Sequence, residues 1–392
     1  MNRWILTAVA FLVAPALAQA QVTGNAFNPA ISLILDGKFS SYSGDLDGYD
    51  FAGFPLDPEI GPPPEGLSLG ESELVLSSNI DDQFYGFMTV ALGDSAEGTE
   101  VSVEEAWIQT LALPAGFSVK AGKMLSGIGY HNSQHAHAWD YVDAPLPYQV
   151  MLGGALGDAG IQVRWVAPTD LLLELGAEVL RGDSYPAAGA GDSGTGTWTA
   201  FAHLGGDLGA SNSWRVGLSR VSFDVAGRSY DLLADQGEFY GSGSVDIVDG
   251  IWKWAENGNT RARTLVVQAE YLKRREDGRL DVTGDTLNGT SPYAIAQDGF
   301  YVQGAYQFRP MWRLGLRYER IHGDNADLQP PLNGLLDTSG SPDRVTAMLD
   351  YSHSEFSRLR FQVASLDNGQ GSESQVFLQY IMSLGAHGAH QF

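Results

Sequence analysis

Apolar and polar residues alternate with a period of two along most of the chain, and the period of an amphipathic helix is rare. This alternation is typical of β-strands whose two faces meet different surroundings. Segment 312–321 is a clear case, because Trp312, Leu314, Leu316 and Tyr318 alternate with polar or small residues. One face of such a strand suits hydrocarbon and the other suits water.

About sixteen segments of this kind are predicted, and the connections between them alternate between short and long. Tight turns on one rim and long loops on the other are typical of outer-membrane barrels. The clearest strands are 30–43, 83–93, 160–166, 171–180, 214–221, 263–274, 300–309, 312–321, 344–351, 358–365 and 374–384, with weaker ones at 69–80, 101–111, 117–125, 198–206 and 245–255. The long connections are 44–68, 126–159, 182–197, 222–244, 275–299 and 322–343.

The predicted fold is therefore an all-β, transmembrane antiparallel β-barrel of about 16 strands, similar to a porin. A soluble sandwich or propeller also shows alternation, but sixteen strands would need another apolar surface to cover them, and no blade-length repeat occurs. The last strand alternates to the final residue, Phe392. A terminal aromatic resembles the assembly signal of outer-membrane barrels, so the barrel-assembly machinery is an expected partner.

Residues 1–20 are predicted to be a secretory signal peptide, and residues 21–392 the mature barrel. A polar start with Arg3 precedes the apolar stretch 4–17, and Ala18-Gln19-Ala20 provides small residues for cleavage. The apolar stretch is shorter than the roughly 18 to 20 residues that a transmembrane helix needs. Export to the outer membrane of a Gram-negative cell is the expected localisation, with outer-membrane lipid as a partner.

Composition excludes several classes of protein. The 392 residues include no Cys, which rules out disulfides and Cys-ligated metals. A net charge of -24 argues against nucleic acid as a partner.

Ser126 and Ser133 lie near histidines in sequence, but no nucleophile motif surrounds them. We therefore expect no enzymatic activity and no bound cofactor.

Connection 126–159 is expected to fold into the lumen, because sixteen strands enclose a space that side chains cannot fill. It is the longest connection and the third of the external loops, the position from which general porins narrow their pores. Its His131, His135, His137 and Asp140 are candidate ligands for transient binding of Zn²⁺ or another divalent ion. The alternative is that these histidines only hold the loop in place by hydrogen bonds.

Arginines on the inward faces of the later strands form a second candidate set. A charge facing water inside the barrel costs little, whereas an Arg at the lipid midplane costs roughly 2 to 4 kcal/mol. Facing Asp140 and Asp143 of the loop, these arginines could set a transverse field across the constriction. Alternatively, they pair with wall residues Glu270, Glu319 and Asp350. The set comprises Arg309, Arg313, Arg317, Arg344, Arg358 and Arg360.

Three segments carry a resemblance to a known family: 132–146, which reads NSQHAHAWDYVDAPL, the turn 252–259, and the C-terminal stretches 377–380 and 385–390. They resemble Gram-negative outer-membrane proteins labelled zinc-regulated TonB-dependent outer-membrane receptors, and more distantly phosphate-selective porins. The resemblance implies an outer-membrane barrel linked to metal supply, with His135 and His137 as motif positions. The chain departs from TonB-dependent receptors, which have a plug domain and 22 strands.

The function predicted from the sequence is a channel for passive diffusion of small hydrophilic solutes, with divalent metal ions such as zinc among the candidates. A TonB-coupled or gated metal receptor is the first alternative, and a structural or adhesive barrel is the second. A homotrimer is expected only by analogy with porins.

Overall fold

The computed structural model describes residues 29–44, 51–54, 61–95, 98–232, 235–284, 288–326, 328–330, 332 and 338–385. The predicted signal peptide and Phe392 lie outside the described residues.

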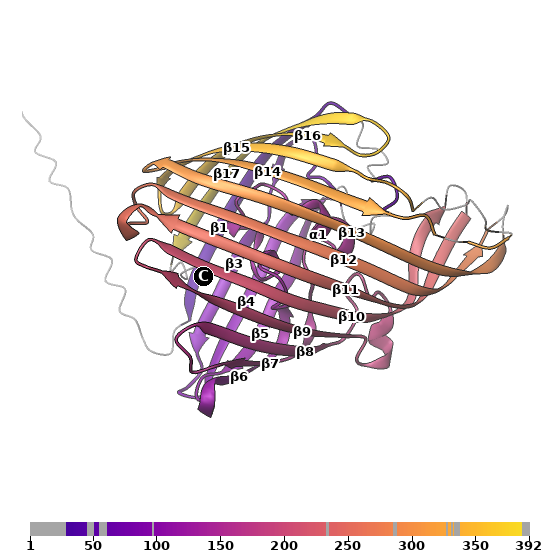
Figure 1. Cartoon of the computed structure of the whole chain (residues 1–392), viewed down its shortest axis with the longest axis horizontal. Coiled ribbons are helices and arrows are strands. Elements are labelled where there is room, and N and C mark those ends of the chain that lie inside the picture. Colours follow the sequence, from indigo (N-terminus) through magenta and orange to yellow (C-terminus); the bar gives the residue numbers. More distant parts are fainter. Residues whose placement is uncertain are drawn as a thin grey trace, which may run out of the picture.

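The described strands form one antiparallel sheet that closes on itself, because the last strand pairs with the first (Figure 1). The described residues include seventeen strands, but β2 and β3 both pair with β1 and together occupy one position in the barrel. The predicted fold, an antiparallel barrel of 16 strands, is confirmed. The strands are β1 (Ala30–Tyr42), β2 (Gly66–Leu69), β3 (Ser72–Asn79), β4 (Phe84–Ser95), β5 (Gly98–Thr110), β6 (Phe117–Leu125), β7 (Gly157–Val166), β8 (Leu172–Leu180), β9 (Thr197–Leu208), β10 (Asn212–Leu232), β11 (Asp235–Ala255), β12 (Thr264–Thr283), β13 (Asn288–Arg309), β14 (Trp312–Gly323), β15 (Asp343–Ser354), β16 (Ser357–Asp367) and β17 (Ser372–Gly385).

The two faces of the sheet have the chemistry that the alternation predicts. On β14, Leu314 and Leu316 are exposed on the outside, whereas Arg317 and Glu319 are buried on the inside. Because apolar side chains cover the outer face and charged ones the inner face, the barrel presents hydrocarbon-compatible surface outward.

Strands β10 to β13 are longer than predicted, at 20 to 22 residues each. The predicted long loops 222–244 and 275–299 are wrong, since most of their described residues continue these strands. On the outer face of β10, apolar Val216 and Leu218 give way to Arg220 and Asp224. These strands therefore extend beyond the apolar band, where backbone pairing continues without lipid (Figure 1).

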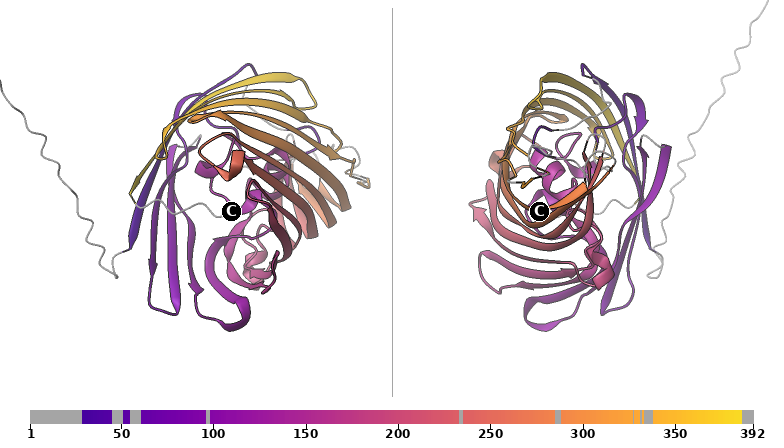
Figure 2. Two further views of the ribbon diagram at one scale, coloured as in Figure 1. Left: turned by 60° about the vertical axis from the view of Figure 1, so that its left-hand side comes forward. Right: turned by 90° about the vertical axis from the view of Figure 1, so that its right-hand side faces the viewer.

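The helical segments between β6 and β7 lie inside the ring of strands (Figure 2). The longest is α1 (Leu146–Leu152), which is buried against β12, β13 and β14. Its apolar residues join inward-facing side chains such as Leu272 and Tyr301 in a core within the barrel. Among the described residues, no helix has the length and apolar character to cross a membrane.

Candidate functional site

The inward loop comprises residues 126–156, between β6 and β7, so the predicted range 126–159 extends three residues into β7. Two short helical turns, η2 (His131–Ser133) and η3 (Ala136–Ala138), precede α1. The backbone N–H of Leu146 at the start of α1 donates to Glu319 Oε1 on β14, at 3.0 Å. This side of the loop therefore packs directly on the wall formed by the later strands.

Asp143 is the main ionic anchor of the inward loop. Its Oδ2 lies 2.6 Å from Arg344 Nη1, and its Oδ1 lies 2.9 Å from Arg317 Nη2. Burial alone would raise the pKa of this loop carboxyl, but the two guanidinium groups outweigh burial and lower the pKa to about 2. Asp143 is therefore ionised and held by two arginines at neutral pH.

The other predicted arginines also have partners or lie elsewhere. Arg313 bridges Asp140 of the loop, at 2.8 Å, and Asp350 of β15, at 2.6 Å. Arg360 pairs with Asp350, and Arg358 donates to the carbonyl oxygen of His137. The placement of Arg309 in the lumen is wrong, because this residue is exposed at the end of β13 beside the turn to β14.

These contacts favour the second interpretation of the arginine set, in which charges pair. Glu319 accepts from Arg344 Nε at 2.5 Å and faces Arg317 Nε at 3.1 Å, so strand and loop carboxylates share the same guanidinium groups. Paired charges produce little net field. The arginines therefore hold the loop against the wall.

His131 lies apart from the other loop histidines and is buried in the barrel interior. Its ring packs against Trp139 and Tyr148, with centroids 4.7 and 4.8 Å away. Its backbone N–H donates to Glu270 Oε1 at 2.8 Å. Burial lowers the pKa of this loop imidazole to about 3, so the ring is neutral at physiological pH. Because Asp140 pairs with Arg313, the structure does not bring His131 and Asp140 together with His135 and His137 as a ligand set.

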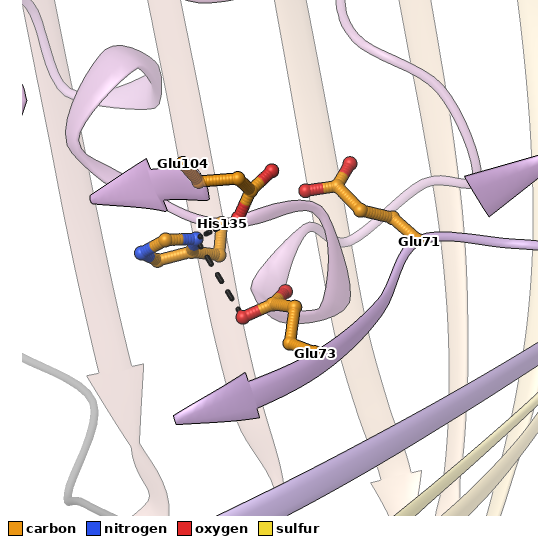
Figure 3. A group of neighbouring side chains, drawn as sticks. All are labelled: Glu71, Glu73, Glu104 and His135. Carbon is orange, nitrogen blue, oxygen red and sulfur yellow. Dashed lines mark hydrogen bonds and ion pairs between the residues drawn. The ribbon is translucent and has the colours of Figure 1, made fainter. Parts of the chain in front are cut away.

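His135 and His137 face the opposite wall, where they meet carboxylates of β3 and β5. Figure 3 shows His135 beside Glu73 and Glu104. His135 Nδ1 lies 3.1 Å from Glu104 Oε2, and His135 Nε2 lies 2.9 Å from Glu105 Oε2. His137 Nδ1 lies 2.5 Å from Glu73 Oε1. Burial opposes protonation of the loop residue His135, but the hydrogen bonds to Glu104 and Glu105 raise its pKa well above the usual range.

Two strand irregularities aim the carboxylates at this point. Glu104 has no partner on β4, because the register passes from Thr89–Glu105 directly to Val90–Val103. Between β2 and β3, residues 70–72 face only two residues of β1. Such bulges redirect side chains that regular alternation would send to the other face. They bring Glu71, Glu73, Glu104 and His135 together, with one ligand atom from each within 4.8 Å of the others.

Sequence reasoning missed Glu71, Glu73, Glu104 and Glu105. The signal available for two of them was the consecutive pair Glu104-Glu105 in a segment that otherwise alternates, since one of two neighbours on a regular strand must face lipid. An acidic residue facing lipid is costly, which favours a bulge at that position.

A cavity of about 790 Å³ remains between the inward loop and the barrel wall. The loop contributes Tyr130, His135 and Asp140 to its lining, and the wall contributes side chains from most strands of the barrel. The loop contacts both the arginine-rich wall and the β3 and β5 wall, so it crosses the lumen and the cavity lies beside it. The loop therefore narrows the interior of the barrel.

A protein of Aquifex aeolicus (strain VF5), described as an uncharacterized protein, is 32% identical to this chain over 352 residues, and the match covers 83% of this chain and 70% of the relative. The chain belongs to the same family as this Aquifex protein. No protein-family model matches the chain.

Solved structures of outer-membrane proteins share the fold of this family member. OmpT of Vibrio cholerae in its trimer form has a TM-score of 0.56 at 12% identity, covering 91% of this chain and 99% of the other. The anion-selective porin of Comamonas acidovorans has a TM-score of 0.52 at 11% identity, with coverages of 91% and 99%. The outer-membrane channel DcaP of Acinetobacter baumannii has a TM-score of 0.51 at 13% identity, with coverages of 91% and 97%. At these identities the likeness shows a porin-like barrel fold.

Proposed function

We propose that this protein is an outer-membrane channel through which small hydrophilic solutes diffuse passively, divalent metal ions such as zinc among them. The observation that carries the proposal is the charged and polar cavity beside the docked loop, inside a barrel with an apolar outer face. The names of the solved structures with this fold, a porin and a channel among them, agree with it.

The arrangement of the loop supports a permanent constriction. Ion pairs fix one side of the loop to β14 and β15, and hydrogen bonds fix the other side to β3 and β5. A rigid element that crosses the lumen limits solute size and still leaves a path beside itself.

The charges around the cavity favour small polar solutes of either sign. Among the described residues, five Lys or Arg and five Asp or Glu side chains line it, so neither sign dominates the potential. The cations are Lys120, Arg164, Arg215, Lys253 and Arg317, and the anions are Glu73, Glu105, Asp140, Asp143 and Glu174. A balanced lining gives weak ion selectivity and weak binding, which lets solutes leave as readily as they enter.

Planar-bilayer recording of the refolded mature chain tests the proposal. Discrete conductance steps are expected in symmetric salt without any energy source. Ser133 is an exposed loop residue that lines the cavity, so Ser133→Trp is expected to lower the step size. Ser354→Trp, at an exposed position at the end of β15, is the control and is expected to leave the step size unchanged.

Absence of conductance from correctly folded protein would contradict the proposal and favour a closed receptor or a structural barrel. Zinc uptake by cells that stops when the proton-motive force is removed would favour a TonB-coupled receptor. Chemical cross-linking in detergent tests the further proposal of a homotrimer, which is motivated by the trimer form of OmpT.

A further inference from the structure

We infer that Glu71, Glu73, Glu104 and His135 form a binding site for a divalent cation of the first transition row, which links the inward loop to the barrel wall. Figure 3 shows these side chains converging from the segment between β2 and β3, from β3, from β5 and from the loop. The inference goes beyond the proposed channel and depends on it only for the effect on conductance.

The geometry is that of a ligand set. Glu104 Oε2 and Glu73 Oε2 lie 3.1 and 3.6 Å from the same nitrogen, His135 Nδ1. When Glu71 is included, one ligand atom from each of the four residues lies within 4.8 Å of the ligand atoms of the other three. Ligands bound to one ion at about 2.0 to 2.2 Å are separated by distances of this order.

An unsatisfied buried atom points to a missing ligand. Glu73 is fully buried, and its Oε2 has no hydrogen-bond donor among the residues that the structure describes. Thr89 lies on β4 between the two acidic strands, and its buried Oγ1 likewise finds no partner in the described part of the chain. Buried polar atoms are nearly always satisfied, so an ion or its bound water is the expected partner.

Like charges crowd this point of the wall. The carboxyl groups of Glu71, Glu73, Glu104 and Glu105 meet the imidazoles of His135 and His137. Lys38 acts on Glu71 but is itself paired with Asp36 at 3.4 Å, and Lys120 acts on Glu105. Carboxylates at these distances repel one another unless protons or cations offset their charge.

Neighbouring residues already orient two of the ligands. Glu105 Oε2 lies 2.9 Å from His135 Nε2, so the ring can donate from Nε2 and leave Nδ1 as the ligand atom. His137 holds Oε1 of Glu73 at 2.5 Å, which leaves Oε2 directed at the cluster. Such carboxylate and imidazole contacts around the ligands are the usual support of a metal site.

The ligand types select the class of ion. An imidazole favours Zn²⁺, Fe²⁺ or Ni²⁺ over Ca²⁺ and Mg²⁺, and three carboxylates accept any of these ions. Without sulfur ligands, the site would follow the general order in which Zn²⁺ binds more tightly than Mn²⁺. Because His135 belongs to the loop and the glutamates belong to the wall, the ion would tie the two together.

Isothermal titration of the full mature chain in detergent with ZnCl₂ tests the site. All proteins carry His387→Ala and His390→Ala, which removes the C-terminal histidines as competing ligands. One Zn²⁺ per chain is expected, and Glu73→Gln and Glu104→Gln are each expected to weaken binding at least tenfold. Parallel titrations with MnCl₂ and CaCl₂ are expected to give weaker binding in that order.

Glu174→Gln is the matched control, because Glu174 is another buried lumen carboxylate beside an imidazole, His203, at 2.9 Å. This variant is expected to bind Zn²⁺ like the parent. Heat-modifiable migration on gels confirms that each variant is folded before it is titrated. The Co²⁺ absorption spectrum of the loaded parent gives a second readout, which is expected to change in Glu104→Gln.

No Zn²⁺ binding by the folded parent, or equal binding by the parent and both variants, would overturn the inference. A tenfold loss in the Glu174→Gln control would overturn it as well, because the effect would not be specific to the cluster. Bilayer recording separates this result from the channel proposal: Zn²⁺ is expected to change the conductance of the parent and not that of Glu104→Gln. Conductance without Zn²⁺ binding contradicts only the metal site, and Zn²⁺ binding without conductance contradicts only the channel.

Discussion

Arg344 on β15 and Asp143 in the inward loop form an ion pair in the barrel interior, with Nη1 and Oδ2 2.6 Å apart. The same guanidinium also reaches Glu319 on β14, so one arginine joins the loop to two strands. Truncating one partner of a buried pair costs more than truncating an exposed one, because the remaining charge stays buried without compensation. The pair therefore provides a direct test of how the loop is held.

Asp143→Asn is expected to weaken docking of the loop by about 3 to 5 kcal/mol, because Arg317 and Arg344 lose their shared carboxylate. Single-channel recording should show more open-channel noise and a larger mean conductance. Asp183→Asn serves as the control, since Asp183 and Arg181 form an exposed pair worth roughly 0 to 1 kcal/mol. Unchanged noise in Asp143→Asn would mean that other contacts suffice to hold the loop.

Acidification is expected to loosen the loop in two steps. His131 stays neutral when the loop is docked, with a pKa of about 3, but would take up a proton near pH 6.5 if released. The contribution of His131 to docking of the loop is unaffected above pH 6.5 and decreases as the pH falls toward 3. Asp143 contributes stability that is fully present above pH 3.8 and is lost as the pH falls through about 2.

The two steps can be separated by His131→Gln, which removes the titrating ring. The parent channel should become noisier from about pH 6.5 downward, whereas the variant should remain quiet until about pH 4. Identical pH profiles for the two proteins would show that His131 does not control the loop.

Ion selectivity depends on a balance that one substitution can shift. Lys120 lines the cavity and lies over the Trp107 ring, 4.4 Å from its centroid. Lys120→Gln leaves four cationic and five anionic side chains, so the reversal potential in a salt gradient should move toward cation preference. Arg261→Gln removes an exposed charge near the turn after β11 and should have little effect. A shift toward anions would contradict the proposed lining.

The outer face of β14 provides a test of the membrane position. Leu316 is 62% exposed on the apolar surface, so Leu316→Arg is expected to destabilise the barrel by roughly 2 to 4 kcal/mol in bilayers. Ser242→Arg places the same charge on the outer face of the β11 extension, where the cost should be close to zero. Urea-induced unfolding from lipid vesicles measures both. Equal costs would mean that the apolar band includes the extension.

Alternation predicted the barrel well because lipid and water act on every second residue. It placed Leu314 and Leu316 outside, and Arg313 and Arg317 inside, as the structure has them. It missed the length of β10 to β13, because the polarity of the two faces reverses in their extensions: Val221 and Phe223 are buried inside, whereas Asp224 is exposed outside. Arg309 was misplaced because the register between β13 and β14 shifts between Gln307 and Arg309.

The candidate site was predicted only in part for a related reason. Loop residues His135 and His137 stood out in the sequence, but their partners are glutamates far away along the chain. Two bulges bring Glu71 and Glu104 inward, and a bulge breaks the period on which strand prediction depends. Sequence spacing also grouped His131 with His135, although packing of the loop sends the two rings to different walls.

The long strands β10 to β13 make the rim of the barrel uneven. A strand of 21 residues is roughly 70 Å long, and at a tilt of about 40° it rises roughly 50 Å, about twice the height of the apolar band. These four neighbouring strands therefore form a screen along one side of the mouth, and the opposite side has shorter strands (Figure 1). Approach to the barrel interior is thus directional, because large molecules arriving over β10 to β13 meet protein first.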